Sequence, residues 1–178
     1  MERRKIPLYI ADILERADKM LALSFVQKPA SGLNLKILEA DEHGVKVFAP
    51  VIPANVPIYR NNSMYGEHNI LFLPDVISDL MLDANKRNVP FDIDHSGTPI
   101  NGVEWIESFQ IDYKQGKLYK SYHGLTDGTW CAILNIVNPM LQAKICNLDF
   151  LGISISGVFS YHEIKLNEAI EIYRELNI

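Results

Sequence analysis

The chain is short of the residues that mark disulfide-rich and zinc-binding proteins. Only two cysteines occur among its 178 residues, Cys131 and Cys146, and they do not form a CxxC pair. This spacing argues against a disulfide framework and against a zinc knuckle. We expect both to be buried free thiols in a reducing compartment.

The sequence also lacks a strong excess of charge and any long apolar run. Its formal net charge is −5, so it has no basic surface of the kind that binds nucleic acid. No run approaches the ~18–20 apolar residues of a membrane-spanning helix, and charged residues interrupt the apolar positions near the N-terminus. We therefore expect a soluble, intracellular protein that binds neither nucleic acid nor a membrane.

Motifs for nucleotide and metal chemistry are missing as well. Neither GxxxxGK(S/T) nor GxGxxG occurs, so phosphate binding by a glycine-rich loop is not indicated. The histidines show no HxxxH or HExxH spacing and are scattered along the chain: His43, His68, His95, His123 and His162. We expect no cofactor and no bound metal.

What the sequence does have is the composition of a globular domain. It is 48% hydrophobic and 22% charged, which is enough to build a sizeable core. Apolar residues at three- and four-residue steps predict an amphipathic helix over 10–25, and Pro29 and Gly32 indicate a linker after it. We place a boundary here, with an N-terminal helix and linker over 1–32 and the main domain over 33–178.

Short strands dominate the main domain. Alternation and turn chemistry predict strands over 33–37, 45–48, 69–73, 89–93, 103–112, 117–122, 129–137 and 148–161. Helices are expected over 74–88, 139–145 and 167–176. This order predicts an α+β fold built around a mostly antiparallel, barrel-like sheet.

A histidine follows the strand predicted over 89–93. His95 lies in the run DHSG at 94–97, which has turn chemistry. A side chain at a strand end is held firmly yet faces an opening, and an imidazole can take and return protons near neutral pH. His95 is therefore a candidate general base, the alternative being a turn histidine that only hydrogen-bonds locally.

Two serines alternate with isoleucines in the run GISISG at 152–157. In a strand this places the hydroxyls of Ser154 and Ser156 on one face and the isoleucines on the other. A serine becomes nucleophilic when a nearby base removes its proton. A strand with one solvated face would show the same pattern, so the alternation alone leaves both interpretations open.

Carboxylates lie in and beside the strand predicted over 103–112. Glu104, Glu107 and Asp112 occur there, and an inward-facing carboxylate could orient a histidine as the third member of a catalytic triad does. The alternative is that these residues form the solvated face of the strand.

The order of the motifs is more specific than any one of them. The chain runs through a proline-rich segment ending in Tyr59-Arg60, then DHSG at 94–97, ESF at 107–109, DGTW at 127–130 and GISISGVF at 152–159. This succession resembles the phage prohead (capsid maturation) serine proteases over residues 45–161.

The resemblance implies a herpesvirus protease-like fold, an antiparallel β-barrel surrounded by helices. It implies an endopeptidase that cleaves scaffold and capsid-protein segments inside the phage prohead, in the host cytoplasm, and a homodimer by analogy with the herpesvirus enzymes. It places the nucleophile at Ser154 and the general base at His95.

The third catalytic residue is less clearly marked. The family has an acidic residue where this chain has Ser156, which leaves a competing serine near Ser154. Glu107, in the segment that matches the family's ESW-like motif, is the predicted third member. His123 is the alternative, because herpesvirus-type sites use a second histidine.

Two other functions remain open at this level. The chain could be a catalytically inactive relative that serves as a structural or scaffold component of the phage head. It could also be a binding module unrelated to phage, in which case its gene would have no link to capsid genes.

Overall fold

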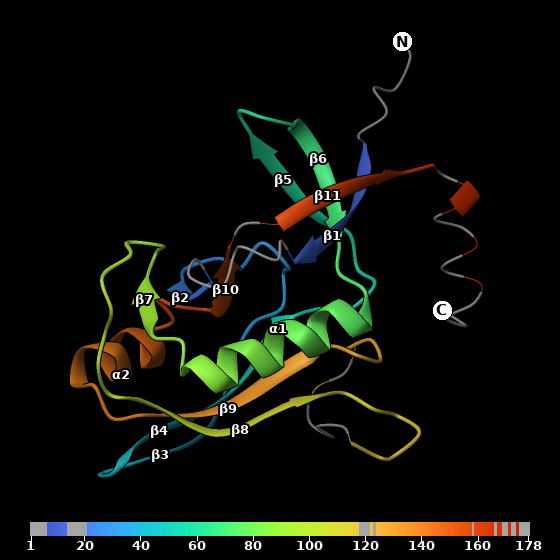
Figure 1. The fold of residues 1–178 in the computed structure, drawn as a ribbon. Coiled ribbons are helices and arrows are strands. Elements are labelled where there is room, and N and C mark those ends of the chain that lie inside the picture. Colours follow the sequence, from blue (N-terminus) through green and yellow to red (C-terminus); the bar gives the residue numbers. More distant parts are fainter. Residues whose placement is uncertain are drawn as a thin grey trace.

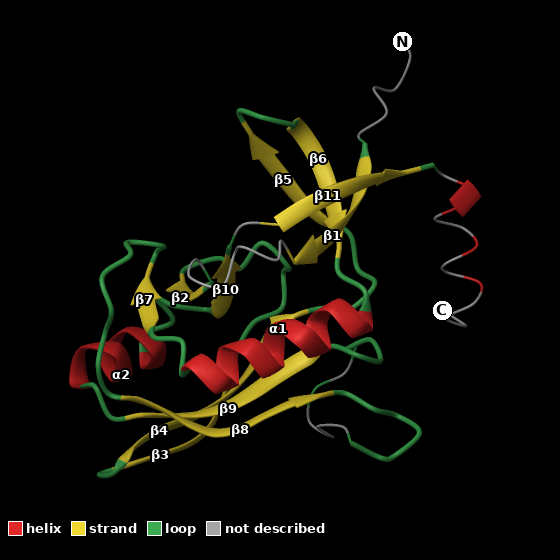
Figure 2. Cartoon of the chain, in the orientation of Figure 1, coloured by secondary structure: helices red, strands yellow, loops and turns green. Residues whose placement is uncertain are grey.

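The structure, a computed structural model, describes residues 7–13, 21–117, 122, 124–157, 159–165, 167–168, 171 and 174. Within these residues the chain forms eleven strands and two helices, and the strands make three sheets (Figures 1 and 2). Six of the eight strand pairings are antiparallel and two are parallel. The predicted mixed class with mostly antiparallel strands is confirmed.

Each sheet combines segments that are distant in the sequence. The first has the order β11 (Phe159–Ile164), β1 (Leu8–Ile13), β6 (Gly66–Leu71), β5 (Ile58–Asn62). The second has the order β10 (Gly152–Ser156), β2 (Ala22–Val26), β7 (Phe91–Ile93). The third has the order β3 (Lys36–Asp41), β4 (Gly44–Ile52), β9 (Trp130–Ile136), β8 (Val103–Gln110). Helix α1 (Pro74–Arg87) packs against β8 and β9 of the third sheet, and α2 (Pro139–Cys146) follows β9 (Figure 1).

No closed barrel is detected among the described strands. The chain passes from the third sheet to the first between Ile52 and Ile58, through Pro53 and Pro57. Proline has no N–H to donate to a ladder, so strand pairing does not continue through this connection. The strands are therefore divided among separate sheets.

The predicted helix over 10–25 is wrong wherever the structure describes it. Its two ends form β1 and β2, and residues 14–20 lie outside the described part of the chain. β2 is the central strand of its sheet, where Leu23 and Phe25 are fully buried. Burial and cross-strand pairing outweigh the helical spacing of these apolar residues. The strands of the first 32 residues are thus built into sheets that the main domain completes.

The helices predicted over 74–88 and 139–145 are confirmed as α1 and α2. Pro74 begins α1, where its missing N–H costs nothing, and Asn88 ends the helix in the left-handed conformation with φ 48°. The side chain of Asn138 caps α2 by accepting from two backbone N–H groups of its first turn.

The strand predicted over 148–161 is two strands in different sheets. β10 ends at Ser156 in the second sheet, and β11 begins at Phe159 in the first. A Cβ on Gly157 would lie 3.0 Å from the ring of Phe159, so glycine allows the chain to turn closely past this ring. Most of the segments predicted as a helix over 167–176 and a strand over 117–122 lies outside the described residues.

The two cysteines, both free, differ in burial. Cys131 is buried on β9, whereas Cys146 is exposed at the end of α2. The prediction of a buried thiol is therefore confirmed for Cys131 and wrong for Cys146. Burial raises the pKa of the Cys131 thiol to about 12, so it stays protonated at neutral pH and is a poor nucleophile.

Candidate active site

A row of polar side chains crosses the second sheet. Ser154 on β10 lies opposite Ser24 on β2, and Ser24 lies opposite Asp92 on β7. Residues directly opposite one another in a sheet share a face, so these three side chains project to the same side. The neighbouring Leu23 and Ile155 are paired on the other face and are buried. The strand alternation therefore produces one polar face and one core face.

The turn after β7 brings an imidazole back over this row. Asp94 and His95 adopt positive φ values of 49° and 57°, a conformation that costs a residue other than glycine about 1–2 kcal/mol. Among the hydrogen bonds of the turn, the N–H of Gly97 donates to Oδ2 of Asp92 over 2.8 Å, and the N–H of Asp94 donates to the carbonyl of Phe25 over 3.1 Å. The turn is thus attached to both β7 and β2.

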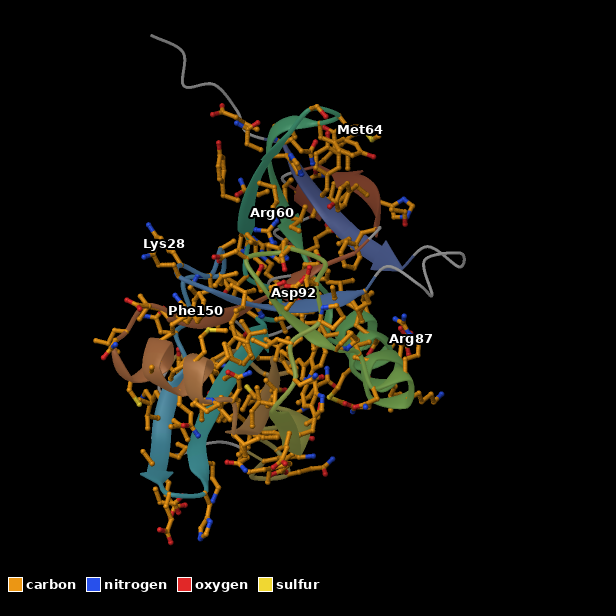
Figure 3. The ribbon with its side chains drawn as sticks, turned by 90° about the vertical axis from the view of Figure 1, so that its left-hand side faces the viewer. Lys28, Arg60, Met64, Arg87, Asp92 and Phe150 are labelled. Atoms are coloured by element: carbon orange, nitrogen blue, oxygen red, sulfur yellow. The ribbon has the colours of Figure 1, made fainter. Side chains whose placement is uncertain are left out.

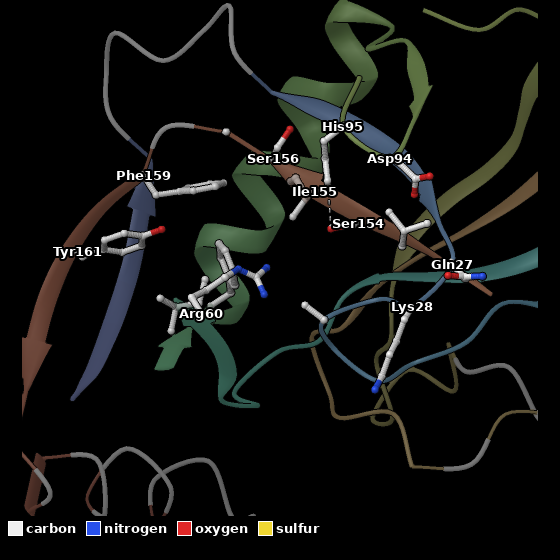
Figure 4. Close-up of a pocket in the computed structure, with 15 residues that line it drawn as sticks. Gln27, Lys28, Arg60, Asp94, His95, Ser154, Ile155, Ser156, Phe159 and Tyr161 are labelled. Atoms are coloured by element: carbon white, nitrogen blue, oxygen red, sulfur yellow. Dashed lines mark hydrogen bonds between the residues drawn. The ribbon is translucent and has the colours of Figure 1, made fainter. Parts of the chain in front are cut away.

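The imidazole lies between two hydroxyl groups. His95 Nε2 is 3.1 Å from Ser154 Oγ (Figure 4). On the other side of the ring, His95 Nδ1 is 2.8 Å from Ser24 Oγ. When Nδ1 carries the proton it donates to Ser24, and Nε2 is free to accept the proton of Ser154. This arrangement has the geometry of a nucleophile, a base and an orienting group.

Burial differs among Ser24, Ser154 and His95. Ser24 is fully buried, Ser154 is half-buried, and His95 is exposed. The hydroxyl of Ser24 is therefore held within the sheet, while Ser154 and His95 face open space. Asp92, which lies opposite Ser24, is also buried, and Figure 3 shows it near the middle of the molecule.

The structure does not bring Glu107 to His95. Glu107 is exposed on β8 in the third sheet, and the contact of His95 Nδ1 is with Ser24. The third position predicted for Glu107 is therefore occupied by a serine hydroxyl. His123, the alternative, lies outside the described residues.

The two candidate serines are also distinguished. Ser154 and Ser156 share one face of β10, as the alternation predicts, but it is Ser154 that contacts His95 Nε2. Ser156 lies opposite Ala22 and faces the same cavity.

Sequence reasoning missed Ser24. It is the single polar residue in the apolar run 21–26. In a buried strand, one polar residue among apolar ones indicates a side chain that hydrogen-bonds on one face of the sheet. The helical interpretation of residues 10–25 concealed it.

A cavity of about 570 Å³ opens beside His95 and Ser154 (Figure 4). His95, Ser154 and Ser156 lie along it, and Phe159 and Tyr161 of β11 supply apolar wall. Burial raises the pKa of Tyr161, and the nearby cation of Arg60 partly offsets this rise. The cavity therefore spans the second and first sheets and offers both apolar surface and charge beside the serine.

Comparisons with protein-family models, with curated proteins and with solved structures give no match for this chain. Neither described helix is long and apolar enough to span a membrane. Over the described ranges, no group of three or more His, Cys, Asp and Glu side chains is placed to hold a metal ion. The geometry of the site is therefore the structural basis for a functional proposal.

Ser24→Ala is expected to slow reaction at Ser154 about fivefold without unfolding the protein. The change removes the acceptor for Nδ1–H, and a neutral hydrogen bond contributes about 1 kcal/mol. The rate of labelling by a serine-reactive phosphonate measures the effect. Ser156→Ala is the matched control, since it removes a hydroxyl from the same cavity that does not contact His95. Equal rates for both variants would contradict an orienting role for Ser24.

Asp92→Ala is expected to destabilise the turn that carries His95. The variant loses the acceptor of the Gly97 N–H, a bond to a charged group that is worth about 1.5–3 kcal/mol. Asp92→Asn keeps an acceptor oxygen and should lose less. Urea unfolding measures stability, and phosphonate labelling measures the site. Asp94→Asn, on an exposed neighbour that also has positive φ, is the control; a loss as large in this variant would refute the anchoring role of Asp92.

Proposed function

We propose that the chain is a serine endopeptidase in which Ser154 is the nucleophile and His95 its general base. The observation that carries this proposal is the 3.1 Å contact between His95 Nε2 and Ser154 Oγ at the edge of an open cavity. Ser24, at Nδ1 of the same ring, replaces the acid of a conventional triad.

The reaction is acyl transfer. Ser154 Oγ bonds to the peptide carbonyl carbon as its proton passes to His95 Nε2. The tetrahedral adduct then collapses: the C–N bond breaks, and Nε2 returns the proton to the leaving amine. Water attacks the carbonyl carbon of the resulting ester and gives a proton to Nε2. The bond from this carbon to Ser154 Oγ then breaks, Nε2 returns the proton to Oγ, and the new carboxyl end is released.

A serine in the orienting position has a chemical consequence. The hydroxyl of Ser24 can accept from Nδ1–H, which is compatible with the productive tautomer of His95, but it can also donate to Nδ1, so it does not select that tautomer as a carboxylate would. It stabilises the imidazolium less than a carboxylate would, because charge-assisted hydrogen bonds are about twice as strong as neutral ones. We therefore expect a slower enzyme than one with an acidic third member.

The biological role that we propose is cleavage of scaffold and capsid proteins during phage prohead maturation in the host cytoplasm. The order of the motifs from Tyr59-Arg60 to GISISG supports it. We propose a distant relation to the herpesvirus assembly proteases, supported by the mostly antiparallel sheets and the strand-borne serine. Two features depart from that pattern: the described strands do not close into a barrel, and Ser24 stands where a second histidine is expected.

The second candidate is an inactive structural component of the phage head. The neutral third residue favours it, since Ser24 supports an imidazolium weakly. Labelling with a fluorophosphonate followed by peptide mass spectrometry separates the two functions. The protease should carry the adduct on Ser154; an intact folded protein with no adduct on this residue would refute the endopeptidase.

A further inference from the structure

Arg60 of β5 lies in the same cavity as the proposed nucleophile. It lines the main cavity together with Ser154, and it also lines a second, smaller hollow with Ser154 and Ile155. Figure 4 shows its guanidinium pointing away from Tyr161 and toward the part of the cavity that holds Ser154. A cation on a separate sheet is thus placed beside the reacting serine.

The positive charge of the Arg60 guanidinium is not paired with a carboxylate among the described residues. None of the ion pairs within the described ranges includes Arg60, and its Nη1 donates to the backbone carbonyl of the adjacent Tyr59 over 3.2 Å. Arg60 is half-buried, and this burial lowers its pKa. A guanidinium has five N–H donors. Among the described residues that of Arg60 has one backbone acceptor, so this partly desolvated cation is suited to bind an anion.

The surroundings favour an anion that has an apolar stem. Lys28 also lines the cavity, and Asp94 is the one carboxylate among its described lining residues. Glu67, on the hairpin of β5 and β6 that carries Arg60, accepts a hydrogen bond from the hydroxyl of Tyr59. Ile70 and Phe72 supply apolar wall, which can cover the methylene groups of an acidic side chain.

We propose that Arg60 selects substrates that carry a glutamate close to the bond attacked by Ser154. This inference rests on the proposed function, because only an endopeptidase has a substrate. The binding of a glutamate by Arg60 requires only the cavity. Arginine and a carboxylate form paired, parallel hydrogen bonds that a neutral amide cannot reproduce. Glutamate should be preferred to aspartate because its longer stem covers more of the apolar wall.

The test is a binding measurement on the Ser154→Ala protein, which keeps the peptide intact. The probes are pairs of fluorescent octapeptides. The two members of a pair differ at one position, which is Glu in one and Gln in the other, and this position is moved along the peptide from pair to pair. At one position the Glu peptide should bind at least tenfold more tightly than its Gln partner. Adding Arg60→Gln should remove this preference, and Arg60→Lys should restore part of it.

Lys114→Gln in the same background is the matched control, because it removes a cation from an exposed position outside the cavity and should keep the preference. Equal or absent binding of Glu and Gln peptides at every position would overturn the inference, as would a preference that survives Arg60→Gln. Phosphonate labelling of the protein with Ser154 intact is run alongside. It reports the proposed function alone, so failure of the endopeptidase and failure of the Arg60 site give different results.

Discussion

Ser154→Ala should abolish labelling by a serine-reactive phosphonate and reduce peptide cleavage by about 10³-fold or more. The variant removes the atom that forms the covalent bond, and His95 is then left without a hydroxyl to activate. Labelling followed by mass spectrometry, and cleavage of co-expressed scaffold and capsid proteins, measure the two effects. A half-buried hydroxyl contributes little to folding, so the circular dichroism spectrum and the melting temperature should be unchanged.

Ser156→Ala is the control for this experiment. It alters the neighbouring hydroxyl on the same face of β10, which is not the one that contacts His95. We expect nearly full labelling and processing. Processing that persists in Ser154→Ala but stops in Ser156→Ala would assign the nucleophile to Ser156 and refute the mechanism proposed above.

His95→Asn should lower the labelling rate and the cleavage rate about 10²–10⁴-fold, the usual contribution of a general base. Asparagine is the informative replacement because residue 95 has φ 57°, a conformation that asparagine tolerates better than alanine. The turn should therefore persist while the proton acceptor is lost. The rate of phosphonate labelling and the unfolding curve in urea separate these two effects.

His43→Asn serves as the comparison, because His43 is an exposed histidine in the turn between β3 and β4. It should react at the rate of the unaltered protein. If His95→Asn retained the full labelling rate in a folded protein, Ser154 would not depend on an imidazole base, and the proposal would reduce to a reactive serine without a catalytic partner.

The sequence was most informative where neighbouring residues determine the outcome. Helix α1 begins at a proline and ends at a left-handed asparagine, and its predicted bounds agree closely with the structure. The strand character of 152–156 follows from alternating serine and isoleucine. These features depend on backbone preference and side-chain periodicity, which are readable from a short window.

The N-terminal segment shows where this reasoning fails. Residues 10–25 have helical spacing, yet the described part of this segment forms β1 and β2 because other strands pair with it. Partners such as β10 and β11 lie more than a hundred positions further along the chain. No local pattern reports such pairing, so the whole-chain arrangement was needed to place Ser24 in a strand.

The candidate site likewise has features that local sequence predicts and features that depend on the tertiary structure. By itself the sequence made His95 and Ser154 the candidate base and nucleophile, with Ser156 as the competing serine, and it indicated that the two serines share a face. Only the tertiary structure decided that His95 lies between Ser154, 59 positions away, and Ser24, 71 positions away. The reason is physical: residue types and local spacing set which atoms can react, whereas strand register across a sheet sets which of those atoms meet.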